Sequence, residues 1–250
     1  MAADLYAGFA ERYDLFHGEF GRHDPEQVRF FQQLFACHQV RAVLDCACGT
    51  GQHLHLFHSL GYEVTGSDIS PSMLAQARKN LAGAGIRVPL HQVDYRALPE
   101  HFDARFDAVT CLSSSLLHME DDEQALRALR SMRAVLRQGG VLVLTQGTTD
   151  RQWAEKPRFI LATNTAESSR LFVIDYLRTG ARYNIVDITR GGGQNELEVW
   201  SVEYPHILLR DDQHRLLQAA GFSSIEFYGS YRSDPYHKEE SRQLIAVAVR

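Results

Sequence analysis

Three acidic residues stand where apolar runs end in the first 100 residues of the chain. Asp45, Asp68 and Asp94 each close a segment that we expect to form a buried strand. Because the carboxyl ends of parallel strands meet at one edge of a sheet, the three carboxylates are predicted to line a single crevice. Carboxylates can attract a cationic amine, accept from two ribose hydroxyls, or accept from the exocyclic amine of adenine. The pattern predicts a ligand that contains an amine, a ribose and an adenine.

A glycine-rich turn follows the first of these acids. Gly49 and Gly51 can adopt positive φ and let a ligand approach the main chain closely. The helix expected after them directs its free N–H groups into the same crevice. A dinucleotide fingerprint needs a third glycine, where Leu54 stands instead, and a pyrophosphate would meet carboxylates. The turn therefore favours S-adenosylmethionine over a nicotinamide dinucleotide.

The order of apolar runs predicts the fold class. Five expected strands alternate with helical patterns, which indicates an α/β, Rossmann-like doubly wound sheet with five parallel strands. Two final strands should add a C-terminal hairpin with one antiparallel strand. The expected strands are 42–46, 63–67, 87–93, 106–112, 141–146, 224–228 and 243–249.

After Gly147 the pattern changes to period-2 alternation. The segments 170–178, 181–190 and 196–210 predict a small antiparallel β insertion of three strands after the fifth strand. We expect a single domain over residues 1–250, in which residues 1–40 form an N-terminal helical lid and residues 158–210 a platform against the crevice. The platform aromatics either line a substrate pocket or only pack on the sheet: Tyr176, Tyr183, Trp200 and Tyr204.

Composition limits the partners. The net charge of −5 lacks the basic excess typical of nucleic-acid surfaces, and no apolar run approaches the length of a membrane span. The N-terminus does not resemble a secretory signal, and the four cysteines lie in or beside apolar segments, as buried thiols do in a reducing compartment. We therefore expect a cytoplasmic protein that acts on a small molecule, binds no nucleic acid or membrane, and can form a homodimer through its exposed platform.

No metal site is predicted. His53, His55 and His58 do not share one face of a helix, because successive residues are separated by 100°. The pair Cys46 and Cys48 lacks the second cysteine pair of a zinc site.

Three sequence segments resemble the class I S-adenosylmethionine-dependent methyltransferases. They are Leu44–Gly51 (LDCACGTG), Asp68–Leu74 (DISPSML) and Asp94-Tyr95. The Ala-Cys-Gly-Thr-Gly form is most similar to the branch that holds glycine N-methyltransferase and the bacterial amino-sugar N,N-dimethyltransferases. The resemblance covers roughly residues 4–146 well and the rest of the chain more loosely.

The resemblance implies a role for each matching position. Asp45 and the backbone of Gly49 would hold the methionine part of S-adenosyl-L-methionine, and Asp68 the ribose. Ile69 and Met73 would lie against the faces of the adenine. The other cofactor-binding residues implied are Asp94 and the Tyr95 amide at the adenine edge, together with Tyr6, Tyr13, Ala47, Gly51 and Leu112.

Two residues are candidates for catalysis. In the resemblance, Tyr13 lies over the sulfonium side of the cofactor, where its ring can make a cation–π contact and its hydroxyl can orient the nucleophile. His118 would face the substrate amine as its base or its orienting acceptor. Alternatively, Tyr13 is a core aromatic and His118 only flanks the next helix. We favour methyl transfer to a small-molecule amine; transfer to a hydroxyl or carboxyl oxygen, or cofactor binding without catalysis, are the alternatives.

Overall fold

A seven-stranded sheet forms the centre of the computed structural model, which describes residues 4, 8–13, 19–103, 106–191 and 194–250. The strand order is β10-β11-β5-β4-β1-β2-β3, and β11 is antiparallel to both of its neighbours. This confirms the predicted Rossmann-like doubly wound sheet with its C-terminal hairpin. The strands are β1 Ala42–Asp45, β2 Glu63–Asp68, β3 Leu90–Gln92, β4 Phe106–Cys111, β5 Leu136–Gln146, β10 Ser223–Tyr228 and β11 Leu244–Val249.

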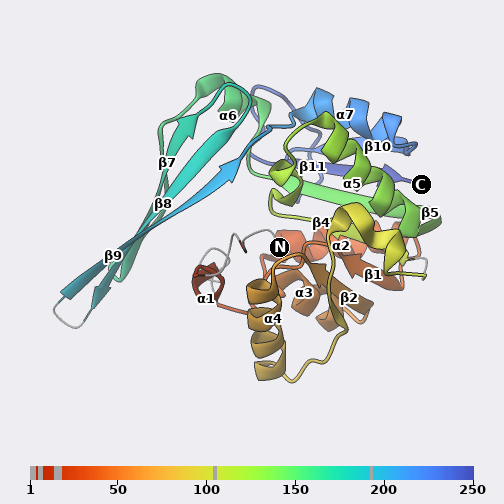
Figure 1. The fold of residues 1–250 in the computed structure, drawn as a ribbon, viewed down its shortest axis with the longest axis horizontal. Coiled ribbons are helices and arrows are strands. Elements are labelled where there is room, and N and C mark those ends of the chain that lie inside the picture. Colours follow the sequence, from red (N-terminus) through yellow and green to blue (C-terminus); the bar gives the residue numbers. More distant parts are fainter. Residues whose placement is uncertain (1–3, 5–7, 14–18, 104–105, 192–193) are drawn as a thin grey trace.

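Helices cover both faces of this sheet (Figure 1). On one face, α2 Pro25–Cys37, α3 Gln52–Ser59 and α4 Pro71–Gly83 pack on the strands through apolar side chains such as Phe31, Phe57 and Leu74. On the other, α5 Asp122–Val135 and α7 Arg210–Ala219 contribute Leu129, Met132 and Leu217. The other helices in the described part of the chain are short: α1 Ala10–Tyr13, α6 Asp150–Glu155, η2 Tyr95–Glu100 and η3 Ser115–His118.

A second, four-stranded antiparallel sheet projects from this core (Figure 1). We call this sheet the platform; it consists of β6 Phe159–Asn164, β7 Ser168–Tyr176, β8 Ala181–Gly191 and β9 Gln194–Tyr204. The prediction of three strands was wrong, because it omitted β6. The last strand also ends at Tyr204 and not at Arg210, since Pro205 follows and cannot donate a ladder hydrogen bond.

One buried side chain holds the two ends of the platform segment together. The Nε2 of Gln146 donates to the carbonyl of Thr148, where the chain leaves β5, at 2.6 Å, and to the carbonyl of Leu208, where it returns, at 2.9 Å. The Oε1 of Gln146 accepts from Gln213 of α7 at 2.7 Å. The Gln146 side chain thus ties the start and the end of the platform segment to each other and to α7.

The predicted N-terminal elements are seen in part. The segment expected as a helical lid, residues 1–40, contains α1 and α2, and Asp24 caps α2 by accepting from the amide of Glu26. Tyr6 lies outside the described residues. No helix within the described ranges has the length and apolarity needed to cross a membrane.

Candidate active site

Asp45 ends β1 as a completely buried carboxyl group. Neither of its oxygens makes a hydrogen bond of full geometry among the described residues, although the Ala47 amide and the Thr110 side chain lie close enough to lower its pKa. Burial raises the pKa of Asp45 to about 7, and the negative charge of nearby Asp68 acts in the same direction. An unpaired buried carboxylate is costly, so this position is suited to a cationic partner that arrives from outside the chain.

Asp68, at the end of β2, joins the glycine-rich turn to α4. Its Oδ2 accepts from the amide of Gly49 at 2.8 Å and its Oδ1 from the amide of Ser70 at 2.9 Å. Burial raises the pKa of Asp68. Because each carboxylate oxygen can accept more than one hydrogen bond, both retain capacity for ligand hydroxyls.

The two glycines of the turn have different functions. Both have positive φ, +51° at Gly49 and +92° at Gly51. A Cβ at Gly49 would lie 3.8 Å from the ring of Tyr13, on the open side of the turn. A Cβ at Gly51 would instead contact Ala77 and Leu81 of α4 at 3.4 Å. Gly51 thus serves helix packing, and Gly49 keeps the crevice side open.

An apolar surface adjoins these acids. Ile69 is a large hydrophobic residue that is 55% exposed directly after Asp68, whereas Met73 is buried in the first turn of α4. Asp4, which the sequence did not indicate as a site residue, accepts from the Ser70 hydroxyl at 2.8 Å and from the Ser72 amide at 3.1 Å. The N-terminal segment therefore contacts the start of α4 beside Asp68.

The third acid is less available than predicted. Asp94 accepts from the Arg96 guanidinium through both oxygens, at 3.0 and 2.9 Å from Nε. Burial alone would raise the pKa of Asp94, but the hydrogen bonds and charge of Arg96 outweigh it and hold the pKa below its usual value. The hydroxyl of Tyr95 donates to the carbonyl of Ser115 at 2.9 Å, and Leu112 is buried. An adenine edge at Asp94 must share the carboxylate with Arg96.

Together these groups fit S-adenosyl-L-methionine. The orphaned carboxylate of Asp45 matches its amine, the remaining acceptor capacity of Asp68 its ribose, and the exposed Ile69 an adenine face. Ala47 and Gly49 lie in the turn between the acids, where the main chain comes close to a ligand.

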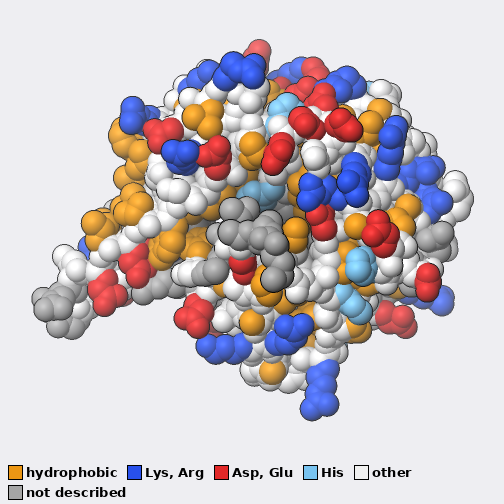
Figure 2. Space-filling model, in the orientation of Figure 1, with side chains coloured by type: hydrophobic (Ala, Val, Ile, Leu, Met, Phe, Trp, Pro, Cys, Tyr) orange, Lys and Arg blue, Asp and Glu red, His pale blue; other side chains and the backbone are white. Residues whose placement is uncertain are grey.

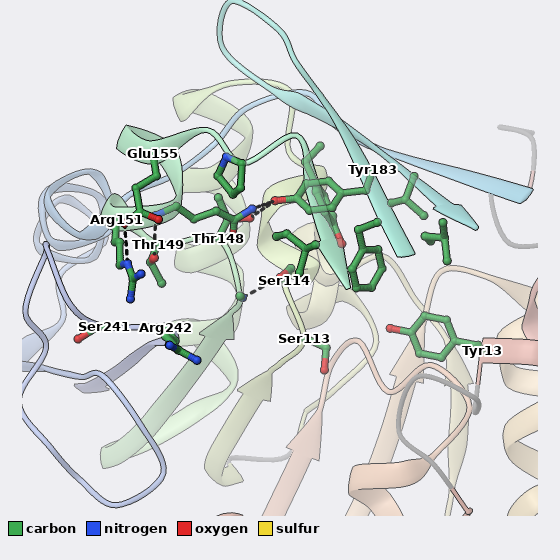
Figure 3. Close-up of a pocket in the computed structure, with 18 of the residues that line it drawn as sticks. Tyr13, Ser113, Ser114, Thr148, Thr149, Arg151, Glu155, Tyr183, Ser241 and Arg242 are labelled. Carbon is green, nitrogen blue, oxygen red and sulfur yellow. Dashed lines mark hydrogen bonds and ion pairs between the residues drawn. The ribbon is translucent and has the colours of Figure 1, made fainter. Parts of the chain in front are cut away.

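A cavity of about 600 Å³ lies between the edge of the main sheet and the platform. Its walls come from five parts of the chain: the N-terminal segment 9–13, the ends of β4 and β5, helix α6, the platform, and the loop before β11 (Figure 3). The platform contributes alternate residues from one face, which are mainly apolar or aromatic: Ile160, Phe172, Tyr183, Ile185, Val202 and Tyr204. The alternation means that these residues share the inner face of the platform, and that part of this face is directed at the cavity.

Tyr13 and Phe9 close the cavity on the side of the glycine-rich turn. Both line it, and their rings meet edge to face at 5.7 Å between centroids. Phe9 also contacts Trp200 of β9 at 5.0 Å. The hydroxyl of Tyr13 is directed toward the side where Ser113 lies (Figure 3). Tyr13 therefore lies between Gly49 and the cavity, as the predicted lid residue would.

Two consecutive serines after β4 have strained backbones. Ser113 and Ser114 have φ of +56° and +68°, a region that non-glycine residues seldom adopt. Their amides donate to the hydroxyl and the carbonyl of Thr145 at 2.9 and 2.8 Å, which holds the turn. Both serines line the cavity. Strain of this kind gathers at functional sites, and sequence spacing gave no signal of it.

His118 lies one layer behind the cavity wall. Its ring packs against Tyr204 at 5.1 Å between centroids. Tyr204 lines the cavity, whereas His118 is not among the lining residues. Burial lowers the pKa of His118 to about 4. The imidazole is therefore neutral at physiological pH and is a weak proton acceptor.

Polar groups gather at the end of the cavity near α6. The hydroxyl of Tyr183 contacts the Thr148 hydroxyl at 2.9 Å and accepts from Gln152 Nε2 at 2.7 Å (Figure 3). Arg151, ion-paired with Glu155 at 2.9 Å, lies at the same end. Of the four platform aromatics considered in the sequence, Tyr183 and Tyr204 line the pocket, whereas Tyr176 packs on Trp153 and Trp200 on Phe9.

The family described as "Methyltransferase domain" matches residues 43–140, which span β1 to the middle of β5. Over this part the chain matches a methyltransferase domain, its relatives include N-methyltransferases, and the solved structures that it resembles include S-adenosylmethionine-dependent methyltransferases. The resemblance predicted from the sequence is thereby confirmed, together with its cofactor.

Two groups of N-methyltransferases are among the relatives of this chain. A glycine/sarcosine N-methyltransferase of Aphanothece halophytica is 28% identical over 246 residues, which cover 96% of this chain and 88% of that protein. A dTDP-3-amino-3,6-dideoxy-alpha-D-glucopyranose N,N-dimethyltransferase of Streptomyces fradiae is 37% identical over 145 residues, or 57% of this chain and 54% of the relative.

Solved structures share the whole architecture of the methyltransferase. An S-adenosylmethionine-dependent methyltransferase from Clostridium acetobutylicum ATCC 824 superimposes with a TM-score of 0.80 at 17% identity and covers 98% of both chains. An amino pentose methyltransferase from Micromonospora echinaspora was solved with S-adenosylmethionine bound. It superimposes with a TM-score of 0.73 at 23% identity, and the match covers 96% of this chain and 95% of that protein. At these identities the likeness concerns the fold.

Proposed function

We propose that the methyltransferase transfers a methyl group to the amine of a small molecule that is larger than glycine. The observation that carries this is the cavity of about 600 Å³ with its apolar and aromatic platform wall. Cavities of roughly 300–1,000 Å³ enclose drug-sized ligands, so glycine would leave most of this one empty. Relatives that methylate amines, those of amino sugars among them, support nitrogen as the acceptor atom.

The cofactor positions are assigned on the same basis. We propose that Asp45 binds the cofactor amine, that Asp68 binds the ribose hydroxyls, and that Ile69 and Met73 flank the adenine. Asp94 would accept a hydrogen bond from the adenine edge and retain its ion pair with Arg96. The remaining contacts are proposed for Ala47, Gly49, Gly51, Tyr95 and Leu112, with Tyr6 and Tyr13 in the lid formed by residues 1–40.

In this proposal, positioning supplies most of the catalysis. The bound cofactor supplies an activated methyl group with a good leaving group. The chain holds the acceptor in the cavity, with Phe9 and Tyr13 excluding water and the Tyr13 hydroxyl orienting the nitrogen lone pair. Holding two reactants in line contributes about 7–11 kcal/mol when the geometry is right, so covalent help is not required.

We assign His118 an orienting function and not that of the main base. A group with a pKa of about 4 does not hold a proton well at neutral pH, and a cationic cofactor nearby would disfavour its protonation further. Its contact with Tyr204 places it where it can fix that ring, which lines the acceptor cavity. His118 is thus a positioning residue in this mechanism.

We also propose a cytoplasmic enzyme that has no nucleic-acid partner. The net charge of −5 supports the second point, and three free cysteines that are buried, Cys46, Cys48 and Cys111, fit a reducing compartment.

An acceptor screen tests the proposal. The purified chain with S-adenosylmethionine is offered matched pairs of an amine and the corresponding alcohol, from glycine through aminosugars to arylalkylamines, and release of S-adenosylhomocysteine is measured. We expect turnover of amines larger than glycine, at least about 100-fold above their alcohol partners. Equal or higher turnover of the alcohols, or of glycine over all larger amines, would contradict it.

A further inference from the structure

The walls of the acceptor cavity carry an excess of positive charge. Among its described lining residues, the charged side chains are those of Arg151, Glu155 and Arg242. Two of these are cationic and one is anionic, although the chain as a whole has a net charge of −5. On the face of the molecule shown in Figure 2, basic and acidic side chains are interspersed. The positive excess is therefore local to the cavity.

Arg242 is the source of this excess. Arg151 is paired with Glu155 at 2.9 Å, so the charges of these two side chains cancel. Arg242 forms no ion pair within the described residues. Asp150, at the start of α6, does not line the cavity, and its carboxylate accepts from the hydroxyl of Tyr236 at 2.8 Å. The N–H donors of the Arg242 guanidinium thus remain available to a ligand.

The loop that carries Arg242 is anchored to the rest of the protein. The hydroxyl of Ser241 accepts from the amide of His237 at 2.9 Å, and the amide of Ser241 donates to the carbonyl of His237 at 2.9 Å. The hydroxyl of Tyr236 also accepts from the amide of Asp150 at 3.0 Å, which ties the loop to the start of α6. The backbone at Arg242 is therefore held in place beside the cavity.

Arg242 and the reactive end of the cavity lie on opposite sides. Figure 3 shows Arg242 and Arg151 on one side and Tyr13 on the other. The methyl group is expected on the side of Tyr13, because Tyr13 lies between Gly49 and the cavity. An acceptor whose amine is placed for transfer therefore extends from Tyr13 along the apolar platform wall, and its remote end comes to lie beside Arg242.

We propose that Arg242 binds an anionic group, a carboxylate or a phosphate, at the end of the acceptor that is remote from its amine. A guanidinium presents its donors in a planar fork that matches the oxygens of either group. The anion is not the carboxylate of an α-amino acid such as glycine, because that group is attached beside the amine and would stay at the Tyr13 end. This binding mode rests on the proposed function, since it requires an amine acceptor in the cavity.

Calorimetric titration of the full chain, saturated with S-adenosylhomocysteine, tests this binding mode without methyl transfer. The probes share an aminoethylphenyl body and differ in the para group, which is a carboxylate, a phosphate or a neutral carboxamide. We expect the wild type to bind the carboxylate or the phosphate probe about 10- to 100-fold more tightly than the carboxamide. The tighter of the two identifies the anion. High salt should reduce the preference by screening.

Two substitutions at Arg242 test the residue assignment. Arg242→Gln removes the charge and should bind the anionic and neutral probes about equally. Arg242→Glu should prefer the neutral probe, because its carboxylate repels the anion. Arg232→Gln is the matched control: Arg232 lies on the same loop, pairs with Glu26 at 2.6 Å and does not line the cavity. It should keep the preference of the wild type. Titration with S-adenosylhomocysteine shows that each variant is folded.

Two results would overturn the proposal. One is a wild type that binds neither anionic probe more tightly than the carboxamide. The other is a preference for the anion that Arg242→Gln retains. A failure of the acceptor screen to favour amines would instead overturn the proposed function, and it would leave the ratio of these dissociation constants unaffected.

Discussion

The edge of the main sheet and the inner face of the platform form two halves of one active site by different means. The edge presents carboxylates and a tight backbone turn, at Asp45, Asp68 and Gly49, where strand topology dictates that a ligand binds. The platform presents aromatic and aliphatic side chains, such as Phe172 and Tyr183, on a sheet of its own. In the proposed active site, the edge binds the cofactor by charge and hydrogen bonds, and the platform selects the acceptor by shape.

The difference explains why the cofactor could be named before the acceptor. Hydrogen-bonding groups at fixed positions require a particular partner, whereas an apolar wall accepts any ligand of suitable volume. Substitutions in one half should therefore leave the other half's ligand unaffected.

The largest effect is expected at Asp45. Asp45→Asn removes the charge that faces the cofactor amine, and binding of S-adenosylhomocysteine in a calorimetric titration should weaken at least about 100-fold. In the wild type the bound amine favours the ionised carboxylate, so affinity should rise by up to about tenfold per pH unit until pH 7 and then level off. This pH dependence should vanish in the variant.

The same substitution should stabilise the fold. Because the pKa of Asp45 is raised from 3.8 to about 7, its ionisation costs stability progressively between those values and fully above pH 7. The free energy of unfolding of Asp45→Asn should therefore exceed that of the wild type by on the order of 2–4 kcal/mol at pH 8 and should equal it below pH 4. Denaturant unfolding measures this difference. Asp103→Asn, on an exposed loop, is the control. A variant that binds normally or melts earlier at pH 8 would contradict the assignment.

A smaller effect is expected on the platform. Phe172→Ala removes a large apolar side chain from the cavity wall, so the KM of the amine identified in the screen should rise roughly 10- to 100-fold. The dissociation constant of S-adenosylhomocysteine should stay within about twofold. Phe159→Ala removes the same side chain from the outer face, where it is 62% exposed, and should leave KM unchanged. Equal losses in both ligands would show that the two halves are coupled.

The smallest effect concerns the pH profile. With a pKa of about 4, His118 stays neutral throughout the range from about pH 5.5 to 8, so kcat/KM should show only the rise that follows deprotonation of the acceptor amine. His118→Gln, which is always neutral, should keep this shape even if its rate is lower. A wild-type inflection near pH 6.5 that is lost in His118→Gln would restore the histidine as a base.

Sequence reasoning succeeded where local chemistry and topology agree. The acids at 45 and 68 and the turn at Gly49 lie where expected, because parallel strands bring their carboxyl ends to one edge. Ser70, within the matched segment Asp68–Leu74, caps α4, and its hydroxyl accepts from the amide of Met73.

Sequence reasoning failed where the structure depends on contacts between distant residues or on an unusual backbone conformation. Strand β6 ends in the polar residues Thr163 and Asn164, which hid its pairing with β7. The contact of Asp4 with Ser70 spans 66 residues of sequence. The left-handed backbone at Ser113 is one that serine rarely adopts, so no pattern could predict it. The volume of the cavity depends on five separate segments that only the folded chain brings together.

Gln146 has a consequence for how such an enzyme can change its substrate. This one glutamine donates to the carbonyls at which the platform segment leaves and rejoins the core. The two ends of the segment are therefore close together in space, whatever the conformation of the roughly sixty residues between them. A replacement segment of different length would have to close the same short gap, and doubling its length costs only about 0.6 kcal/mol in closure entropy. We therefore expect that the platform can be exchanged as a unit. Grafting a different segment between residues 148 and 208 should change the acceptor specificity and leave the cofactor-binding edge of the main sheet unchanged.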